Sequence, residues 1–248
     1  MIELRPATTR GHTRHDWLER WHSFSCADYR DPAHLHWGPL RALDDVCIAP
    51  GAGVSPHGYR DTEIISLVLA GTLEIRDSLG RSLRVRPGEV HRLSAGHGVV
   101  QGEINPSPEE PLHYLQISII PDVVGLQPSS ELTCFGDHDR HDRLCLLASS
   151  DGEAGSLHLN QDIRLFGSAL AVGSCLQHVV APHRLAYLHV LRGKLAVNGH
   201  PLGAGDALRI GEDIALRIVG GEAGGELLLF DLPAQRAGFQ REGASKAS

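Results

Sequence analysis

The chain has 248 residues, of which 42% are hydrophobic and 21% are charged, and its formal net charge is −7. This composition is ordinary for a globular protein, and the length allows one large domain or two small ones. The negative charge argues against a nucleic-acid partner, because phosphate binding requires a concentrated basic surface. No apolar run approaches the ~20 residues of a membrane span, and residues 1–5 lack the apolar core of a signal peptide. We therefore expect a cytoplasmic protein with no membrane partner.

The five cysteines are far apart in the sequence and form no C-x-x-C pair. This pattern predicts neither a disulfide framework nor a zinc knuckle, so buried, reduced thiols are the simpler interpretation. The 28 glycines interrupt many short apolar runs. Such punctuation is typical of tight turns in an all-β chain.

The N-terminal 60 residues contain the only segment that favours a helix. Residues 16–21 have a helical apolar pattern, and Asp16 is placed to cap it. The pair His34 and His36 has metal-ligand spacing but lies in an irregular stretch, so we interpret it as loop.

Beyond residue 62 the pattern is one of strands. Residues 63–69 are nearly continuously apolar, as in a strand buried on both faces. Residues 72–77 and 82–86 alternate between polar and apolar, and 112–120 form another strand candidate that stops before Pro121.

The second half of the chain repeats the first. Residues 68–75 (Val-Leu-Ala-Gly-Thr-Leu-Glu-Ile) align with 190–197 (Val-Leu-Arg-Gly-Lys-Leu-Ala-Val). The aligned glycines are 193 − 71 = 122 residues apart. This repeat predicts a duplicated β-barrel. We assign residues 1–121 to an N-terminal barrel, 122–160 to a connecting segment, 161–233 to a C-terminal barrel and 234–248 to a disordered tail.

Residues 51–105 contain the pattern of the two cupin signatures, in which a His-x-His pair and a third histidine meet at one metal ion. On a strand, residues i and i+2 face the same side, so His57 points with Tyr59, and Gln101 points with Glu103. The four could bind one divalent transition metal (Fe, Ni, Mn, Cu or Zn). Tyr59 and Gln101 stand where imidazoles are expected, and phenol and amide are weak ligands. The alternative is a metal-free pocket in which Tyr59, Gln101 and Glu103 hydrogen-bond to each other or to water.

Other candidate ligands have simpler interpretations. Glu63 fits the acidic position of the cupin signature, but a carboxylate at the start of a strand can equally pair with a nearby arginine. We interpret His91, His97 and His113 as turn or surface residues. His178 corresponds to His57 in the second half, yet no histidine or glutamate follows at i+2, so the C-terminal barrel has no complete site.

Several ordered motifs make the chain similar to the pirin family of bicupins, in the bacterial branch of quercetin 2,3-dioxygenase-like proteins. They include residues 22–29 (His-Ser-Phe-Ser-Cys-Ala-Asp-Tyr), 31–32 (Asp-Pro), 160–162 (Asn-Gln-Asp) and 228–233 (Leu-Leu-Phe-Asp-Leu-Pro). Cys26 stands where the family motif has phenylalanine.

The resemblance implies two tandem cupin barrels with little helix and a mononuclear metal in the first. It implies that positions 57, 59, 101 and 103 are the metal ligands, of which His57 and Glu103 conform here. In the family reaction a metal-bound flavonol reacts with dioxygen, the ring opens and carbon monoxide leaves. Glu103 would then be both a ligand and the catalytic base for the flavonol hydroxyl.

Three functions follow as hypotheses. The first is a metal-dependent quercetin 2,3-dioxygenase-type oxygenase that acts on a small aromatic, flavonol-like ligand with a degraded ligand set. The second is a non-enzymatic bicupin that binds a small molecule or a protein, with weak or no metal binding. The third is metal-free chemistry in which Glu103 and Tyr59 act as acid–base groups.

Overall fold

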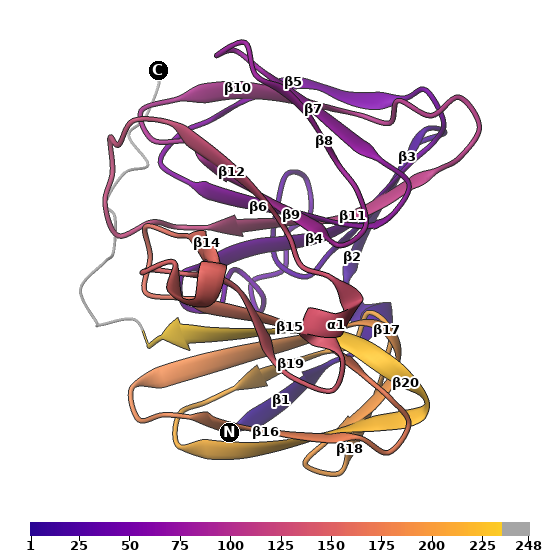
Figure 1. The fold of residues 1–248 in the computed structure, drawn as a ribbon, viewed down its shortest axis with the longest axis vertical. Coiled ribbons are helices and arrows are strands. Elements are labelled where there is room, and N and C mark those ends of the chain that lie inside the picture. Colours follow the sequence, from indigo (N-terminus) through magenta and orange to yellow (C-terminus); the bar gives the residue numbers. More distant parts are fainter. Residues whose placement is uncertain (235–248) are drawn as a thin grey trace.

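The computed structural model describes residues 1–234, which fold into two β-barrels that share one interface (Figure 1). The N-terminal barrel consists of a four-stranded and a seven-stranded sheet. The first contains, in spatial order, β5 (Gly53–Tyr59), β10 (Val99–Ile104), β7 (Leu73–Asp77) and β8 (Ser82–Val85). The second contains β12 (Ser129–Cys134), β9 (Glu89–Ser94), β6 (Glu63–Ala70), β11 (Leu112–Ile119), β4 (Leu40–Ile48), β3 (Leu18–His22) and β2 (Gly11–Arg14).

The C-terminal barrel is a single nine-stranded sheet that bends around its own core. Its main path contains β1 (Ile2–Arg5), β19 (Ala207–Ile210), β17 (Arg184–Val197), β20 (Ile214–Pro233), β15 (Arg164–Leu170), β13 (Cys145–Ser149) and β14 (Leu157–His158). Beside this path, β16 (Cys175–Val180) pairs with β20, and β18 (His200–Gly203) pairs with β17. The prediction of an all-β bicupin is confirmed.

Helix is scarce in the described residues. It is limited to the short helix α1 (Asp137–Arg140) and to two 3-10 turns, η1 (Ala7–Thr9) and η2 (Glu153–Gly155). No helix within residues 1–234 is long and apolar enough to cross a membrane.

The helix predicted at residues 16–21 is wrong. Residues Leu18–His22 form strand β3, which pairs with β2 on one side and with β4 on the other. The helical pattern, with Asp16 as a cap, does not decide the structure, because two neighbouring strands supply backbone hydrogen bonds to residues 18–22.

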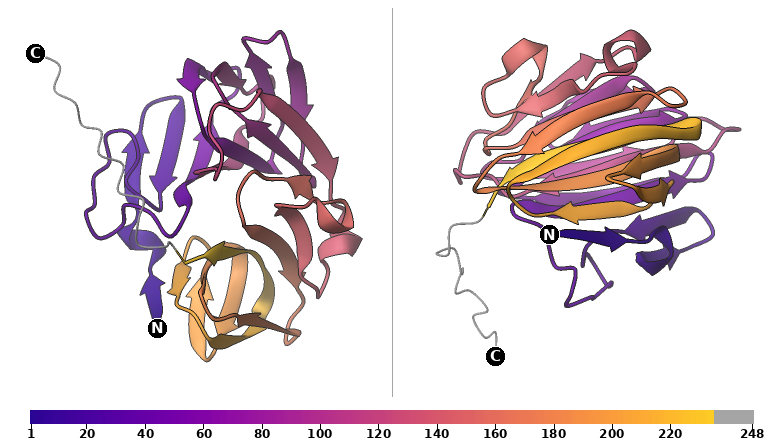
Figure 2. Two further views of the ribbon diagram at one scale, coloured as in Figure 1. Left: turned by 90° about the vertical axis from the view of Figure 1, so that its left-hand side faces the viewer. Right: turned by 90° about the horizontal axis from the view of Figure 1, so that it is seen from below.

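The first strand of the chain belongs to the sheet of the C-terminal barrel. β1 pairs antiparallel with β19, and Figure 2 shows it beside the orange and yellow strands of that barrel. The connecting segment 122–160 also contributes β12 to the N-terminal barrel and β13 to the C-terminal one. The division at 121 and 160 therefore remains a proposal about folding units, and the tail lies beyond the described residues, from position 235.

The largest apolar cluster fills the space between the two barrels. Alternate residues of β11, namely Leu115, Ile117 and Ile119, face this interface, whereas Tyr114 faces the interior of its own barrel. The other barrel contributes Phe230 and its neighbours. Because β6 and β11 have one face on the interface and one inside the barrel, they are buried on both faces, which explains the continuous apolar run at 63–69.

The repeated sequence motif places a left-handed glycine at the same position in both barrels, between β6 and β7 in the first and at a bulge of β17 in the second. Gly71 and Gly193 have φ values of 79° and 71°, in the left-handed region that favours glycine. A Cβ at Gly71 would lie 2.7 Å from the Pro111 carbonyl oxygen, and one at Gly193 would lie 2.3 Å from that of Gly224. Both positions therefore exclude a side chain because a second backbone segment passes close by.

We expect Gly193→Ala to destabilise the protein much more than Gly199→Ala. Both residues have positive φ, but a Cβ at Gly199 meets nothing within 4 Å. The control should lose about 1–2 kcal/mol from backbone strain, and Gly193→Ala roughly 3 kcal/mol or more because the clash adds to that strain. Urea denaturation of both variants measures the difference; equal losses would contradict the close approach.

Candidate functional site

The four predicted site residues lie on neighbouring strands of the N-terminal barrel. His57 and Tyr59 are on β5, and Gln101 and Glu103 are on β10. Gln101 pairs directly with His57, while a bulge brings Glu103 opposite Val54. His57 is exposed at the rim, and Gln101 and Glu103 are buried beneath it, at 1% and 0% exposure. The pairing of β5 with β10 therefore places His57 and Tyr59 beside Gln101 and Glu103, on the strands predicted from the sequence.

The buried carboxylate of Glu103 is held by three protein donors. Its Oε2 accepts a hydrogen bond from the Tyr114 hydroxyl at 2.5 Å. Its Oε1 accepts from Nε2 of Gln101 at 3.2 Å and from Nε2 of Gln116. A buried carboxylate requires such donors, because it has lost its solvation by water.

Tyr114 and Gln116 were not identified from the sequence as site residues. The available signal was their i, i+2 spacing within residues 112–120, which places both on the face opposite Leu115 and Ile117.

His57 and Tyr59 form a hydrogen-bonded pair above the carboxylate. His57 Nδ1 donates to the Ser55 carbonyl at 3.1 Å, which leaves Nε2 to accept a hydrogen bond from the Tyr59 hydroxyl at 2.6 Å. The Tyr59 oxygen also accepts from Gln116 Nε2 at 3.3 Å. The His57 lone pair that would bind a metal is therefore occupied by a phenolic proton.

Both phenols of the site are held in their neutral form. Burial raises the pKa of Tyr59, and the nearby negative charge of Glu103 raises it further. Burial and Glu103 also raise the pKa of Tyr114 well above its ordinary value. A neutral phenol donates a hydrogen bond well but is a poor metal ligand.

Gln101 presents a buried acceptor without a partner. Its amide nitrogen is directed at Glu103, so the amide orientation is fixed and Oε1 points elsewhere. That oxygen has no hydrogen-bond partner among the described residues. It can accept a hydrogen bond from a ligand hydroxyl or from water.

These residues do not fit a three-histidine, one-glutamate metal centre. The set offers one imidazole whose Nε2 is already hydrogen-bonded, one carboxylate with three donors, one neutral phenol and one amide. A cation here must break the bond from Tyr59 to His57 and compete with the donors to Glu103. It then gains only weak ligands at positions 59 and 101.

The other candidate ligands have structural roles. Glu63 is fully buried, but its Oε1 accepts hydrogen bonds from Ser94 and Asn160, both at 2.9 Å. It therefore links the first half of the chain to the second. No arginine within residues 1–234 pairs with it, so that alternative is wrong, and the metal-ligand alternative stays a prediction. His178 Nε2 lies 3.2 Å from the Asp231 carboxylate, a hydrogen-bond contact in the C-terminal barrel.

The interpretation of His91 as a turn or surface residue is also wrong. It lies on β9 with 1% exposure and is 2.8 Å from the Ser130 hydroxyl through Nε2. Burial lowers its pKa to about 4, so it is neutral. His97 is exposed in a turn, and the half-buried His113 contacts Asp45 at 2.5 Å.

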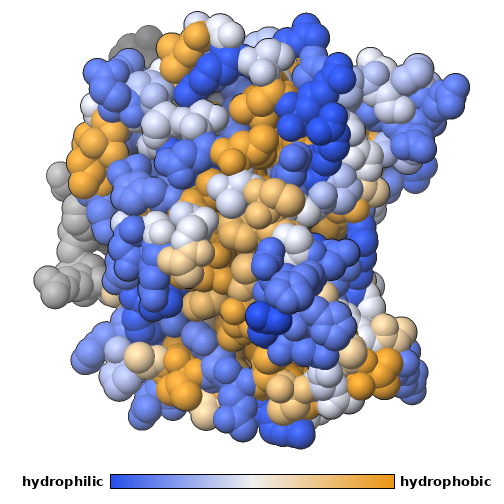
Figure 3. Space-filling view, in the orientation of Figure 1, coloured by the Kyte–Doolittle hydropathy of each residue, from blue (hydrophilic) through white to orange (hydrophobic). Residues whose placement is uncertain are grey.

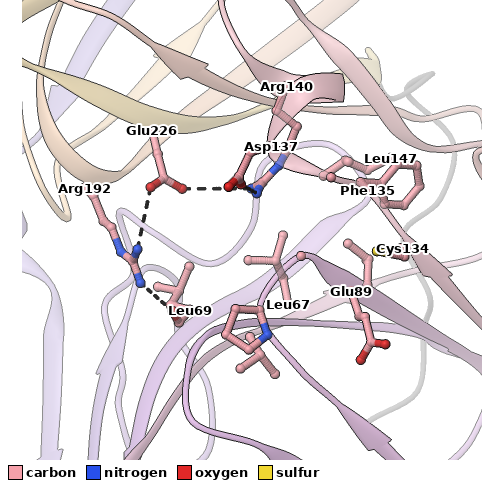
Figure 4. A pocket seen from close by; sticks show the side chains of 15 residues that line it. Leu67, Leu69, Glu89, Cys134, Phe135, Asp137, Arg140, Leu147, Arg192 and Glu226 are labelled. Carbon is pink, nitrogen blue, oxygen red and sulfur yellow. Dashed lines mark hydrogen bonds and ion pairs between the residues drawn. The ribbon is translucent and has the colours of Figure 1, made fainter.

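A cavity of about 450 Å³ lies elsewhere, between the two barrels beside α1. Apolar surface gathers along this part of the face in Figure 3, and Leu67, Leu69 and Phe135 line the cavity. Its charged rim is already paired, since Glu226 lies 3.6 Å from Arg192 and 3.9 Å from Arg140 (Figure 4). None of the four predicted site residues lines it.

The two tandem β-barrels define the protein as a bicupin. Residues 3–119 match the family described as Pirin, and residues 146–232 match that described as Quercetinase C-terminal cupin domain. The chain belongs to the pirin family.

Individual relatives agree with this assignment. The chain is 39% identical to "Quercetin 2,3-dioxygenase" of Escherichia coli K12, over 94% of this chain and 99% of that one. It is also similar to the crystal structure of the bacterial pirin YhhW from Escherichia coli in complex with nickel(II). In that comparison the TM-score is 0.90 and the identity 38%, with 95% of this chain and 100% of that one covered. A quercetin 2,3-dioxygenase from Acinetobacter baumannii shares the fold with a TM-score of 0.74 at 18% identity, covering 94% of this chain and 79% of that one.

The raised pKa values of the buried tyrosines predict a loss of stability in alkali. Burial raises the pKa of Tyr59, Tyr114 and Tyr187, so the unfolded chain loses these phenolic protons first. The contribution of these neutral phenols to the free energy of unfolding is therefore complete below about pH 10. Above that pH the free energy of unfolding falls by about 1.4 kcal/mol per pH unit for each tyrosine.

Tyr59→Phe should make the free energy of unfolding fall less steeply with pH in alkali, by about 1.4 kcal/mol per pH unit, because it removes one of the three phenols. Urea denaturation at a series of pH values between about 9 and 11 measures the slope in both proteins. An unchanged slope in the variant would show that Tyr59 titrates normally.

Proposed function

We propose that the N-terminal barrel is a quercetin 2,3-dioxygenase-type site with a degraded set of metal ligands. It acts on a flavonol or a related aromatic enol, with dioxygen as the second substrate. The observation that supports this is the presence of His57 and Glu103 at two family ligand positions, on the paired strands β5 and β10, in a chain 39% identical to a quercetin 2,3-dioxygenase. Tyr59 and Gln101 occupy the other two positions, so we expect weak retention of a divalent metal and slow turnover.

The contribution of the chain's own residues is acid–base chemistry and orientation. Glu103 is the group that accepts the proton of the enol hydroxyl, and Tyr114 and Gln116 fix the direction of its carboxylate. The free Oε1 of Gln101 accepts a hydrogen bond from a second hydroxyl of the ligand. Because Glu103 is fully buried, neighbouring side chains must move before a substrate reaches it.

A second candidate function is binding of a small hydroxylated ligand without turnover. The complete hydrogen bonding of Glu103 and the bond from Tyr59 to His57 favour it, because both describe a closed, stable polar core. The two functions differ in one measurable consequence, the consumption of dioxygen when quercetin is added.

The double variant Tyr59→His, Gln101→His tests the proposal directly. It restores two imidazoles, and even changes around a metal site alter affinity by roughly 10–100-fold, so we expect metal affinity to rise by more than about 100-fold. Quercetin-dependent dioxygen uptake should rise with it. Elemental analysis of untagged protein, purified without chelator, and an oxygen electrode give the two readouts.

Glu103→Gln is the control, because it keeps the size of the side chain but removes the charge. Wild-type turnover that is slow, and is lost in Glu103→Gln, supports the oxygenase. The opposite result is that wild type and the double variant both bind quercetin, the double variant carries metal, and neither consumes dioxygen. That result would reject the oxygenase and favour ligand binding without turnover.

A further inference from the structure

A second group of metal-ligating side chains lies in the seven-stranded sheet of the N-terminal barrel, whereas Glu103 belongs to the four-stranded sheet. The group consists of His22 on β3, Cys26 in the turn after β3, and Asp44 on β4. One ligand atom of each lies within 4.8 Å of those of the other two. His22 and Asp44 are 2% and 3% exposed, and Cys26 is half-buried. Asp44 pairs across the sheet with Gln116, which contacts Glu103. We propose that His22, Cys26 and Asp44 form a binding site for a thiophilic divalent cation of the Zn²⁺ class.

The ligand set has the chemistry that Zn²⁺ prefers. An imidazole nitrogen, a thiolate sulfur and a carboxylate oxygen are its three usual ligand types, and three of them leave a fourth, tetrahedral position for water. One carboxylate and one thiolate also neutralise the charge of the ion, so a loaded site is compatible with burial.

Two of the three ligands, His22 and Asp44, have a supporting partner that is already in place. Nε2 of His22 lies 3.1 Å from the Thr13 hydroxyl, while Nδ1 faces the Asp44 carboxylate at 2.9 Å. With Nε2 protonated and hydrogen-bonded to Thr13, Nδ1 is free to coordinate, which is the usual arrangement around a metal-bound histidine. The second oxygen of Asp44 faces the Arg20 guanidinium at 3.9 Å.

Loading the site replaces one contact and releases one proton. The single N–H proton of His22 moves from Nδ1, which faces Asp44, to Nε2, where the Thr13 hydroxyl accepts it, and the cation bridges Nδ1 and the Asp44 carboxylate instead. Burial, followed by the charge of Asp44, raises the pKa of the Cys26 thiol, so the empty cluster carries the neutral thiol. Coordination by the cation releases this thiol proton to solvent.

The site is independent of the proposed oxygenase, because it uses neither His57 nor Glu103. It also does not depend on a resident metal at residues 57, 59, 101 and 103, whose donors are a mixed and mostly occupied set.

Cobalt(II) is the probe that separates the two sites. Untagged, full-length protein is stripped with chelator, dialysed and titrated with Co²⁺ while the near-ultraviolet absorbance is recorded. Coordination through Cys26 gives a thiolate-to-cobalt charge-transfer band, whereas exposed histidines and the His57 and Glu103 positions give none. We expect one equivalent of Co²⁺ to produce this band and Zn²⁺ to displace it.

Matched variants decide the assignment. Cys26→Ser should abolish the band and weaken Co²⁺ binding by more than about 100-fold. Cys47→Ser, which removes another half-buried thiol, and Glu103→Ala should both keep the band. Absence of Co²⁺ uptake, uptake without the band, or a band that survives in Cys26→Ser would overturn the proposal.

A second measurement guards against a variant that fails to fold. Circular dichroism and the Tm of metal-free Cys26→Ser are compared with those of wild type, and the Tm of each is measured again with Zn²⁺. Zn²⁺ should raise the Tm of wild type and not that of the variant. If the variant is misfolded, Asp44→Asn replaces it, since it keeps the shape of the side chain and removes the ligand charge. An equal rise in the Tm of wild type and of the folded variant would also overturn the proposal.

Discussion

The interior of the N-terminal barrel is organised by one requirement, that the fully buried Glu103 carboxylate be hydrogen-bonded. A charge without water around it costs several kcal/mol unless donors replace that water. Tyr114, Gln116 and Gln101 supply the donors. Their presence explains why polar side chains point inward from β10 and β11, on strands that are otherwise apolar.

The same requirement explains the hydrogen bonds that Tyr59 and Gln101 make. Gln101 donates a hydrogen bond from its amide nitrogen to Glu103. Tyr59 donates a hydrogen bond to His57, and its oxygen accepts one from Gln116. Imidazoles at these positions could present lone pairs to a cation. Amide and phenol instead complete a hydrogen-bond network around the carboxylate, and the result is a largely closed polar core.

A second cluster of polar side chains lies on β3 and β4 of the same barrel. The register of these strands places His22 opposite Asp44, and the turn after β3 places Cys26 beside both. Because Asp44 is the cross-strand neighbour of Gln116, any ion held there lies next to the network around Glu103. The interface between the barrels is apolar by contrast and is joined by the buried contact from Glu63 to Asn160.

The sequence by itself determined the all-β class, the internal repeat that aligns Gly71 with Gly193, and the common direction of positions 57 with 59 and of 101 with 103. The class and the side-chain directions follow from a local rule, since period-two alternation depends on the neighbouring residues only. Only the tertiary structure decided that residues 18–22 are a strand, that Glu63 faces the second barrel, and that Tyr114 and Gln116 hold Glu103. Each of these depends on which distant strand lies alongside, and strand pairing across a barrel is set by the burial of whole sheets rather than by any local pattern.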